Sequence, residues 1–148
     1  MEVTIERMTL THLEQIKQIL SSKFDEFWNE NVLKGELQNT SSTYIVAVDE
    51  NKEVLGYAGI WKPIDEAHIT NIVTRKDKRE QMIGTKMLDE LIKIAKREKL
   101  NSITLEVNVH NKPAIHLYQK HGFEQVGLRK KYYHQRDDAL IMTLNLKK

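Results

Sequence analysis

A single acidic residue stands in an otherwise apolar and β-branched stretch in the second half of the chain. This residue is Glu106, in the run LEVNV at residues 105–109. A buried carboxylate is costly unless it is paired or used, and a carboxylate beside a substrate can accept a proton as a general base. The alternative is a strand whose even-numbered face is partly wet, with Glu106 solvated or in a salt bridge. The residues leave both interpretations open.

Tyr118 is a further candidate for a residue that carries chemistry. It lies on the apolar stripe of a short helix predicted between Pro113 and Gly122. A tyrosine that only packs in the core is the simpler interpretation of such a stripe.

The histidines and cysteines exclude other chemistry. The chain has no cysteine, so it has no thiolate nucleophile and no thiolate metal site. No HxxxH pair occurs among the six histidines, and His110, His116 and His121 do not repeat at four-residue spacing. We therefore expect no metal catalysis.

A basic segment could bind phosphate. Residues 75–84, RKDKREQMIG, join a predicted strand to the start of a long helix and include Arg75, Lys76, Lys78 and Arg79. The first backbone N–H groups of a helix lack internal partners and carry partial positive charge, so an anion docks there. A charged surface turn is the alternative. Neither GxGxxG nor GxxxxGK followed by Ser or Thr occurs, which excludes the common nucleotide-binding loops.

Composition and charge place these residues in a soluble globular protein. The 148 residues fit one domain, with 40% hydrophobic and 30% charged residues. Residues 1–66 carry a net charge of −6 and residues 67–148 one of +8, so the second half suits an anionic partner. No apolar run reaches the length of a membrane span and the first residues lack a signal-peptide pattern, which predicts a cytoplasmic protein.

Hydrophobic periodicity predicts an α/β fold of mixed type that positions these candidates. The order is strand, two helices, three strands, helix, strand, helix, two strands. The predicted ranges are strand 3–7, a helix from Thr9 or Thr11 to about 20, a helical pattern at 24–37, strands 44–48, 54–61 and 67–74, a helix from 83 to 95, strand 102–109, a helix from 113 to 122, and strands 123–128 and 139–146. Helices between strands in the second half favour a mixed sheet with parallel neighbours and right-handed crossovers.

Three segments resemble the GNAT superfamily of acetyl-CoA-dependent N-acetyltransferases, and within it the RimI type of ribosomal-protein N-terminal acetyltransferases. They are EAHITNIVTRKDKREQMIG at 66–84, LEVNVHNKPAIHLYQKHGFEQVGLRKKYY at 105–133 and DDALIMTLNL at 137–146. Separate stretches match in order and spacing over about the last 80 residues. The resemblance implies the GNAT fold, a twisted mixed sheet of six or seven strands with helices on both faces, as a single domain over residues 1–148. It also implies acetyl-CoA as cosubstrate, without a metal.

The resemblance assigns residues to acetyl-CoA. Residues 79–84 correspond to the family's pyrophosphate loop Q/R-x-x-G-x-G/A, in which Gly84 matches and Met82 stands where a glycine is usual. The backbone at Ile72 to Thr74 would run beside the pantetheine arm, which Asn111 would help to hold. The implied cofactor-binding residues are Ile72, Val73, Thr74, Arg79, Glu80, Gln81, Met82, Ile83, Gly84, Thr85 and Asn111.

Catalytic roles follow from the same match. Glu106 corresponds to the family's proposed base, Tyr118 to the acid that protonates the departing thiolate, and backbone N–H groups near Val73 could polarise the acetyl carbonyl. Tyr132 and Tyr133 would line the substrate side.

The expected acceptor is the N-terminal amine of a protein, and the resemblance points to the eighteenth small-subunit ribosomal protein. An acetyltransferase for a polyamine or amino sugar is the alternative, with Glu26, Glu30 or Glu36 forming an acidic pocket. A CoA-binding regulator without catalysis is a third, motivated by Met82. Direct nucleic-acid binding is not expected, because aromatic residues are not interleaved with the basic ones. Association with membranes is not expected either, and the chain would be a monomer or homodimer.

Overall fold

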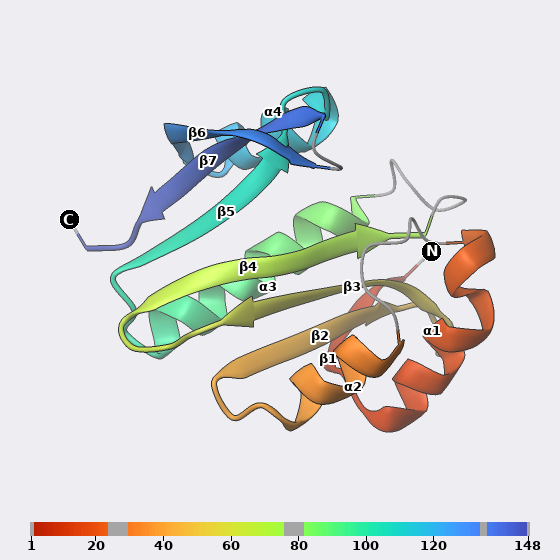
Figure 1. Ribbon diagram of the computed structural model, residues 1–148. Coiled ribbons are helices and arrows are strands. Elements are labelled where there is room, and N and C mark those ends of the chain that lie inside the picture. The colour runs from red at the N-terminus through yellow and green to blue at the C-terminus, as the bar shows by residue number, and fades with distance from the viewer. Residues whose placement is uncertain (1, 24–29, 76–81, 134–135, 148) are drawn as a thin grey trace.

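The computed structural model describes residues 2–23, 30–75, 82–133 and 136–147, without the side chains of 17–23, 30–33 and 133. Within these residues lie seven strands and four helices (Figure 1). The strands are β1 (Thr4–Arg7), β2 (Ser42–Val48), β3 (Val54–Trp61), β4 (Glu66–Thr74), β5 (Ser102–Asn108), β6 (Glu124–Tyr133) and β7 (Asp137–Asn145). The helices are α1 (Leu10–Lys23), α2 (Glu30–Gln38), α3 (Ile83–Arg97) and α4 (Lys112–Lys120).

The strands form one mixed sheet in the order β1-β2-β3-β4-β5-β7-β6. Only β4 and β5 pair in parallel among the described strands, and α3 connects them. The predicted element order, the mixed sheet and its seven strands are confirmed. α1 and α2 cover one face of the sheet and α3 the other (Figure 1). None of the helices in the described residues is long and apolar enough to cross a membrane.

The parallel pair holds together over only three residues. Residues 66–68 of β4 pair with residues 102–104 of β5, and beyond His68 the described residues show no further pairing between these strands. In Figure 1 the two strands begin side by side and then diverge. Each keeps its other neighbour, since β4 pairs with β3 through Thr74 and β5 pairs with β7 along seven residues. The sheet therefore opens between two supported strands.

The apolar stripe of α3 packs against the sheet as its spacing predicts. Met87, Leu88, Leu91 and Ala95 are fully buried, Ile94 is buried, and Ile92 is half-buried. Each large side chain removed from water in this way contributes about 1.5–3 kcal/mol. Because the stripe is continuous, α3 is fixed along its length and its first turn is held beside the end of β4.

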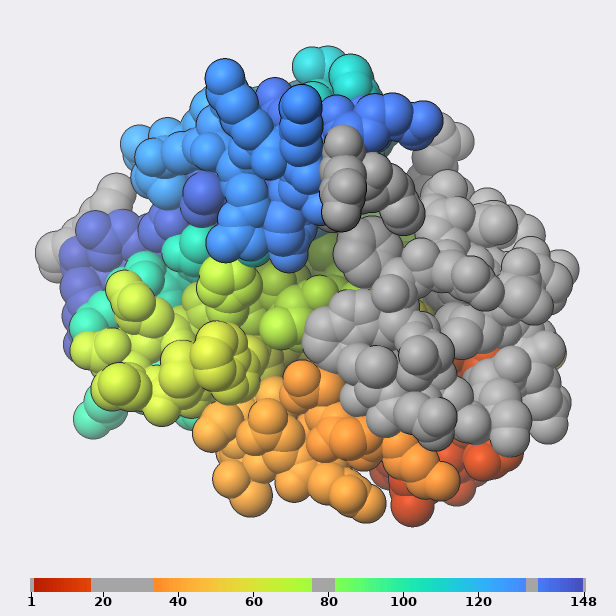
Figure 2. Space-filling model, in the orientation of Figure 1, coloured from red at the N-terminus to blue at the C-terminus, as the bar shows by residue number. Residues whose placement is uncertain are grey.

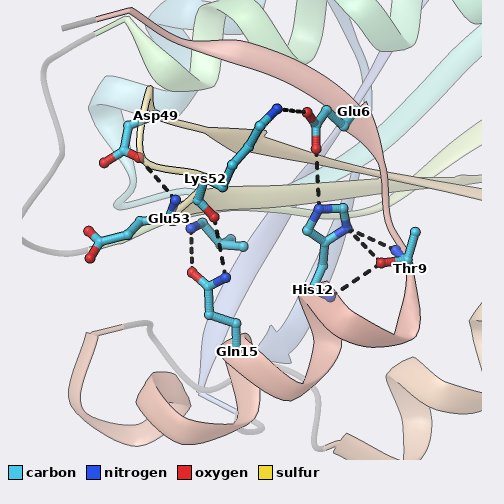
Figure 3. Close-up of polar contacts among 8 residues, drawn as sticks. Glu6, Thr9, His12, Gln15, Asp49, Lys52 and Glu53 are labelled. Carbon is cyan, nitrogen blue, oxygen red and sulfur yellow. Dashed lines mark hydrogen bonds and ion pairs between the residues drawn. The ribbon is translucent and has the colours of Figure 1, made fainter.

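A polar cluster fastens the start of α1 to the β2–β3 turn (Figure 3). The Glu6 carboxylate lies 2.7 Å from Lys52 Nζ and 3.3 Å from His12 Nε2, while the Gln15 Oε1 accepts a 2.6 Å hydrogen bond from the Val54 N–H. The hydrogen bond from Lys52, and then the one from His12, hold the pKa of Glu6 below its ordinary value. Thr9 precedes the helix and its hydroxyl accepts from the His12 N–H, so Thr9 is the cap.

Among the boundaries that differ from the sequence prediction, those of the last two strands concern the site. β6 continues through Tyr133 instead of ending at Leu128, and β7 begins at Asp137 instead of Ala139. The pairing is irregular between Arg129 and Tyr133, where Lys131 has a φ of 52° and its N–H donates to the Asp138 carboxylate. This bulge lets a polar segment continue the strand. The helical pattern expected from residue 24 falls partly outside the described residues, and its described part is α2.

Candidate active site

A cavity of about 400 Å³ lies where β4 and β5 part. Consecutive residues of both strands line it, residues 68–73 of β4 and 105–108 of β5. Consecutive residues of a strand point to opposite faces of the sheet, so the cavity is a gap through the sheet and not a pocket on one face. Asn111, Tyr118 and Tyr132 complete the lining. A space of this size suits part of a small organic ligand.

Glu106 lies in this cavity between two cationic or potentially cationic groups. Its side chain is 14% exposed, with Oε2 2.9 Å from the Arg129 Nη1 and Oε1 3.5 Å from the His68 Nε2. The Arg129 guanidinium also lies 4.7 Å from the centre of the Tyr132 ring. In Figure 2 the blue surface of the C-terminal strands adjoins the yellow-green surface of the β4 region. Strand β6 thus contributes to a site whose walls are β4 and β5.

Tyr118 reaches the same cavity from the other face of the sheet. It is buried and packs on Phe123 at 5.8 Å between ring centres, within the core cluster that contains Leu105 and Val107. Because side chains alternate along β5, Glu106 points away from that cluster. The carboxylate and the phenol share one cavity only because the strands have parted.

A buried polar group stands in the β4 wall. The register of β3 with β4 shifts at Gly59, which leaves Thr70 as an extra residue in β4. The Tyr44 hydroxyl hydrogen-bonds with the Thr70 hydroxyl at 2.9 Å and accepts from the Asn71 side-chain N–H at 3.1 Å. Burial raises the pKa of Tyr44. Asn71 is 5% exposed, and its Oδ1 has no hydrogen-bond partner within the part of the chain that is described. A buried acceptor left unpaired costs about 1–3 kcal/mol, which a ligand N–H would recover.

The first turn of α3, whose backbone N–H groups have no partner within the helix, lies near the end of β4. Met82 precedes the helix with a φ of 63°, and its side chain makes no capping hydrogen bond with the described residues. A Cβ at Gly84 would meet Leu117 and Thr74 only at 3.6 and 3.9 Å, so packing within the protein does not require glycine there. A ligand that approaches the backbone closely at this position would explain the glycine. The Met82 side chain is exposed, so it packs little against the protein.

Asn111 caps the helix that carries Tyr118. Its Oδ1 accepts a 3.3 Å hydrogen bond from the Ala114 N–H. Pro113 near the start of α4 and Gly122, with a φ of 96°, after its end agree with the predicted boundaries. The cap uses the oxygen of Asn111, and the same residue lines the cavity.

The structure does not bring every predicted site residue into the cavity. Thr74, Met82, Ile83, Gly84 and Thr85 lie outside its lining, at the end of β4 and the start of α3. Arg75 turns back to the Val54 carbonyl at 3.4 Å, and the Glu36 carboxylate accepts from the Ser42 hydroxyl at 2.7 Å. The predictions for Lys76, Lys78, Arg79, Glu80 and Gln81, and for the side chains of Glu26, Glu30 and Tyr133, lie outside what is described.

Several residues in or beside the cavity were not predicted from the sequence, and three of them carry charged or polar groups used below. His68 and Asn71 line it from β4, and Arg129 reaches Glu106 from β6. The sequence predicted strands over 67–74 and 102–109, but not how they pair or in which register. Only the pairing of His68 with Thr104 places His68 two residues from Glu106 along that edge.

Comparison with known proteins gives the same family for sequence and fold. The profile described as the acetyltransferase (GNAT) family matches residues 13–123. A Bacillus subtilis (strain 168) protein provisionally named ribosomal protein bS18-alanine N-acetyltransferase is 30% identical over 98% of this chain and 97% of its own length. An N-alpha-acetyltransferase of Sulfolobus acidocaldarius is 31% identical over 93% and 89%. The crystal structure of the ribosomal-protein-S18-alanine N-acetyltransferase from Escherichia coli superposes with a TM-score of 0.89 at 27% identity, covering 99% of this chain and 96% of that one.

Proposed function

Because the chain belongs to the GNAT family of acetyltransferases, we propose that it transfers the acetyl group of acetyl-CoA to the N-terminal amine of a protein. Acetyl-CoA supplies an acetyl group that is already activated as a thioester. The chain must bind that thioester, admit an amine beside it and move two protons. The cavity between β4 and β5 is the observation that carries this proposal.

The open edge of β4 fits the amide-containing arm of acetyl-CoA. Beyond His68 this edge has no partner in β5 among the described residues, so its backbone N–H and C=O groups face the cavity. An extended ligand with amides can add to such an edge as a strand does. Ile72, Val73 and Asn111 would hold the arm, and the N–H groups of Ile83, Gly84 and Thr85, in the first turn of α3, would bind the pyrophosphate.

Two side chains are placed to handle protons. We assign Glu106 to the side on which the acceptor amine loses a proton, and Tyr118 to the side on which the sulfur gains one. Their approach from opposite faces of the sheet separates the two tasks. Arg129 compensates the charge of Glu106 and also packs on Tyr132, which would contact the acceptor.

A protein N-terminus is the acceptor that the relatives' names support. The Escherichia coli relative, 30% identical over 79% of this chain and 80% of its own length, is named for the alanine N-terminus of ribosomal protein bS18. The homologous ribosomal protein of this chain's own source is therefore the acceptor we propose.

A peptide panel tests the assignment. Purified protein, acetyl-CoA and peptides with different first residues are incubated, and release of free thiol is followed. We expect turnover of a peptide beginning with alanine and none of the same peptide with a blocked N-terminus. Turnover of a polyamine or amino sugar in place of any peptide would contradict the proposal, and so would binding of acetyl-CoA without turnover of any amine.

Two substitutions test the proton-handling roles. Glu106→Gln and Tyr118→Phe should each lower turnover of the preferred peptide about 100-fold or more, the usual worth of acid or base catalysis. Glu124→Gln is the matched control, because Glu124 is exposed and does not line the cavity. Unchanged activity in both site variants would contradict the assigned roles.

A further inference from the structure

Tyr132 lies beside Arg129 although the two residues are three positions apart on one strand. The Arg129 guanidinium lies 4.7 Å from the centre of the Tyr132 ring, and it is paired with Glu106 on the cavity wall. In a regular strand, residues three positions apart point to opposite faces of the sheet and lie about 10 Å apart along it. An irregularity in β6 therefore turns Tyr132 towards the side of the sheet on which Arg129 meets Glu106.

The irregularity is a bulge with two extra residues. Residues 130–132 of β6 lie opposite the single residue Asp138 of β7, and the pairing of the two strands continues on both sides of this interval. Inside the bulge, Lys131 has a φ of 52°, in the left-handed region that a residue with a Cβ rarely adopts. Such a backbone conformation persists only where the surrounding structure holds it.

Asp138 holds the bulge from the neighbouring strand. Its Oδ1 accepts a 2.9 Å hydrogen bond from the Lys131 N–H. Its backbone C=O accepts a 3.0 Å hydrogen bond from the N–H of Val109, the residue that follows β5. A hydrogen bond from a backbone N–H to a carboxylate is stronger than one to a neutral oxygen. Asp138 thus ties the bulge of β6 to the end of the strand that forms one wall of the cavity.

We propose that Asp138 is a positioning residue for the acceptor: its carboxylate fixes the β6 bulge, and the bulge presents the Tyr132 ring to the acceptor in the cavity. This inference rests on the proposed function and adds to it a residue outside the cavity lining. Tyr132 is 44% exposed, so burial contributes little to its placement and the backbone of the bulge sets it. Asp138 itself touches neither substrate in this role, so it acts on the binding of the acceptor and not on the transfer step.

The KM for one N-terminal peptide tests this role. Tyr132→Ala should raise KM about 5- to 30-fold, the factor that one aromatic contact in an interface confers. Asp138→Ala should raise KM by a similar factor, whereas Asp138→Asn keeps an acceptor oxygen and should stay within about 3-fold of wild type. In all three variants kcat and the Kd for CoA should change little, because the lost contact belongs to peptide binding. Asn145→Ala is the matched control with an expected wild-type KM, since the Asn145 Oδ1 accepts from the Lys147 N–H at the other end of β7.

A double variant separates positioning from a general effect on the fold. If Asp138 acts through Tyr132, the variant that combines Asp138→Ala with Tyr132→Ala should have the KM of Tyr132→Ala alone. Two effects that multiply would show that Asp138 acts independently of Tyr132. An unchanged KM in Asp138→Ala or in Tyr132→Ala, or equal rises in Asp138→Ala and Asp138→Asn, would also overturn this inference. Each of these results leaves the proposed function intact.

Hydrogen exchange at the Lys131 N–H tests the geometry in the unmodified protein. This amide should exchange at least about 10-fold more slowly than in an unstructured peptide, because the Asp138 carboxylate binds it. Exchange as fast as in an unstructured peptide would overturn the inference without any variant. A wild-type protein that acetylates no N-terminal peptide would instead overturn the proposed function, and with it the role of the bulge in binding an acceptor.

Discussion

Replacing Met82 by glycine should improve both stability and CoA binding. Met82 has a φ of 63° and precedes α3, at the corner that we assign to the pyrophosphate. Residues with a Cβ pay about 1–2 kcal/mol in this left-handed region, and glycine does not. Glycine also loosens the unfolded chain, which costs about 0.4–1 kcal/mol. Because the Met82 side chain is 61% exposed, its removal forfeits little burial.

The midpoints of these ranges differ by about 0.8 kcal/mol, within limits of about 0 to 1.6 kcal/mol, and this difference is the expected gain in the free energy of unfolding. In a chain of this size each kcal/mol raises Tm by about 2–4 °C, so Met82→Gly should melt about 1–4 °C higher. Removing the Cβ also lets an anion come closer to the first N–H groups of α3. One improved hydrogen bond contributes about 0.5–1.5 kcal/mol, which corresponds to a Kd for CoA that is about 2- to 10-fold lower.

Lys99→Gly is the matched control for this experiment. Lys99 has a φ of 60° just after the last turn of α3, at the opposite end of the helix from Met82. Both variants should gain thermal stability, and only Met82→Gly should bind CoA more tightly in calorimetry. A Tm gain confined to Lys99→Gly would refute the argument about backbone strain at Met82. Equal CoA affinity in wild type and Met82→Gly would refute the argument that the Met82 Cβ hinders the ligand.

Two further predictions concern the elements behind the site. Gly59→Ala should destabilise the protein by about 1–3 kcal/mol in urea unfolding, because its Cβ would lie 2.3 Å from the buried Tyr44 ring; an unchanged midpoint would contradict this packing. The lowered pKa of Glu6 means that its stabilising contribution is present above the ordinary value of 4.5 and is lost as pH falls through the folded-state pKa. Glu6→Gln should therefore be less stable than wild type at pH 7, by less than about 1 kcal/mol for so exposed a pair, and equal to it near pH 3. A difference that persists at pH 3 would contradict the pairing with Lys52.

Most of the fold could be predicted from local patterns. The stripe of α3, the alternation of β5 and the cap of α4 each depend on residues a few positions apart, and the structure keeps all three. The end of β6 could not be predicted in this way. It depends on a bulge at Lys131 that the Asp138 carboxylate holds from the next strand. The polar segment at the end of β6 has the composition of a turn, and only its pairing with β7 shows that it is a strand.

The same distinction applies to the candidate site. Glu106 attracted notice because a charge in an apolar strand is locally unusual, and Tyr118 because it was matched by resemblance. His68 and Arg129 have no such local mark, since a histidine in β4 and an arginine in a basic segment are ordinary. His68 lies near Glu106 because of the register in which β4 pairs with β5, and Arg129 because β6 pairs with β7. Long-range pairing of this kind is not encoded in spacing along the chain.

The support behind each wall of the cavity explains how the gap can exist before a ligand binds. β4 is paired with β3 through Thr74, and the Tyr44 hydroxyl holds both Thr70 and Asn71 in the bulge. β5 is paired with β7 along seven residues, and Arg129 on β6 reaches back to Glu106. Beyond residue 68, the edge of each strand that faces away from the cavity is hydrogen-bonded to another strand, β4 to β3 and β5 to β7. The open inner edge is therefore a stable feature of the sheet, and it keeps His68 and Glu106 facing each other while leaving the β4 backbone free to bind.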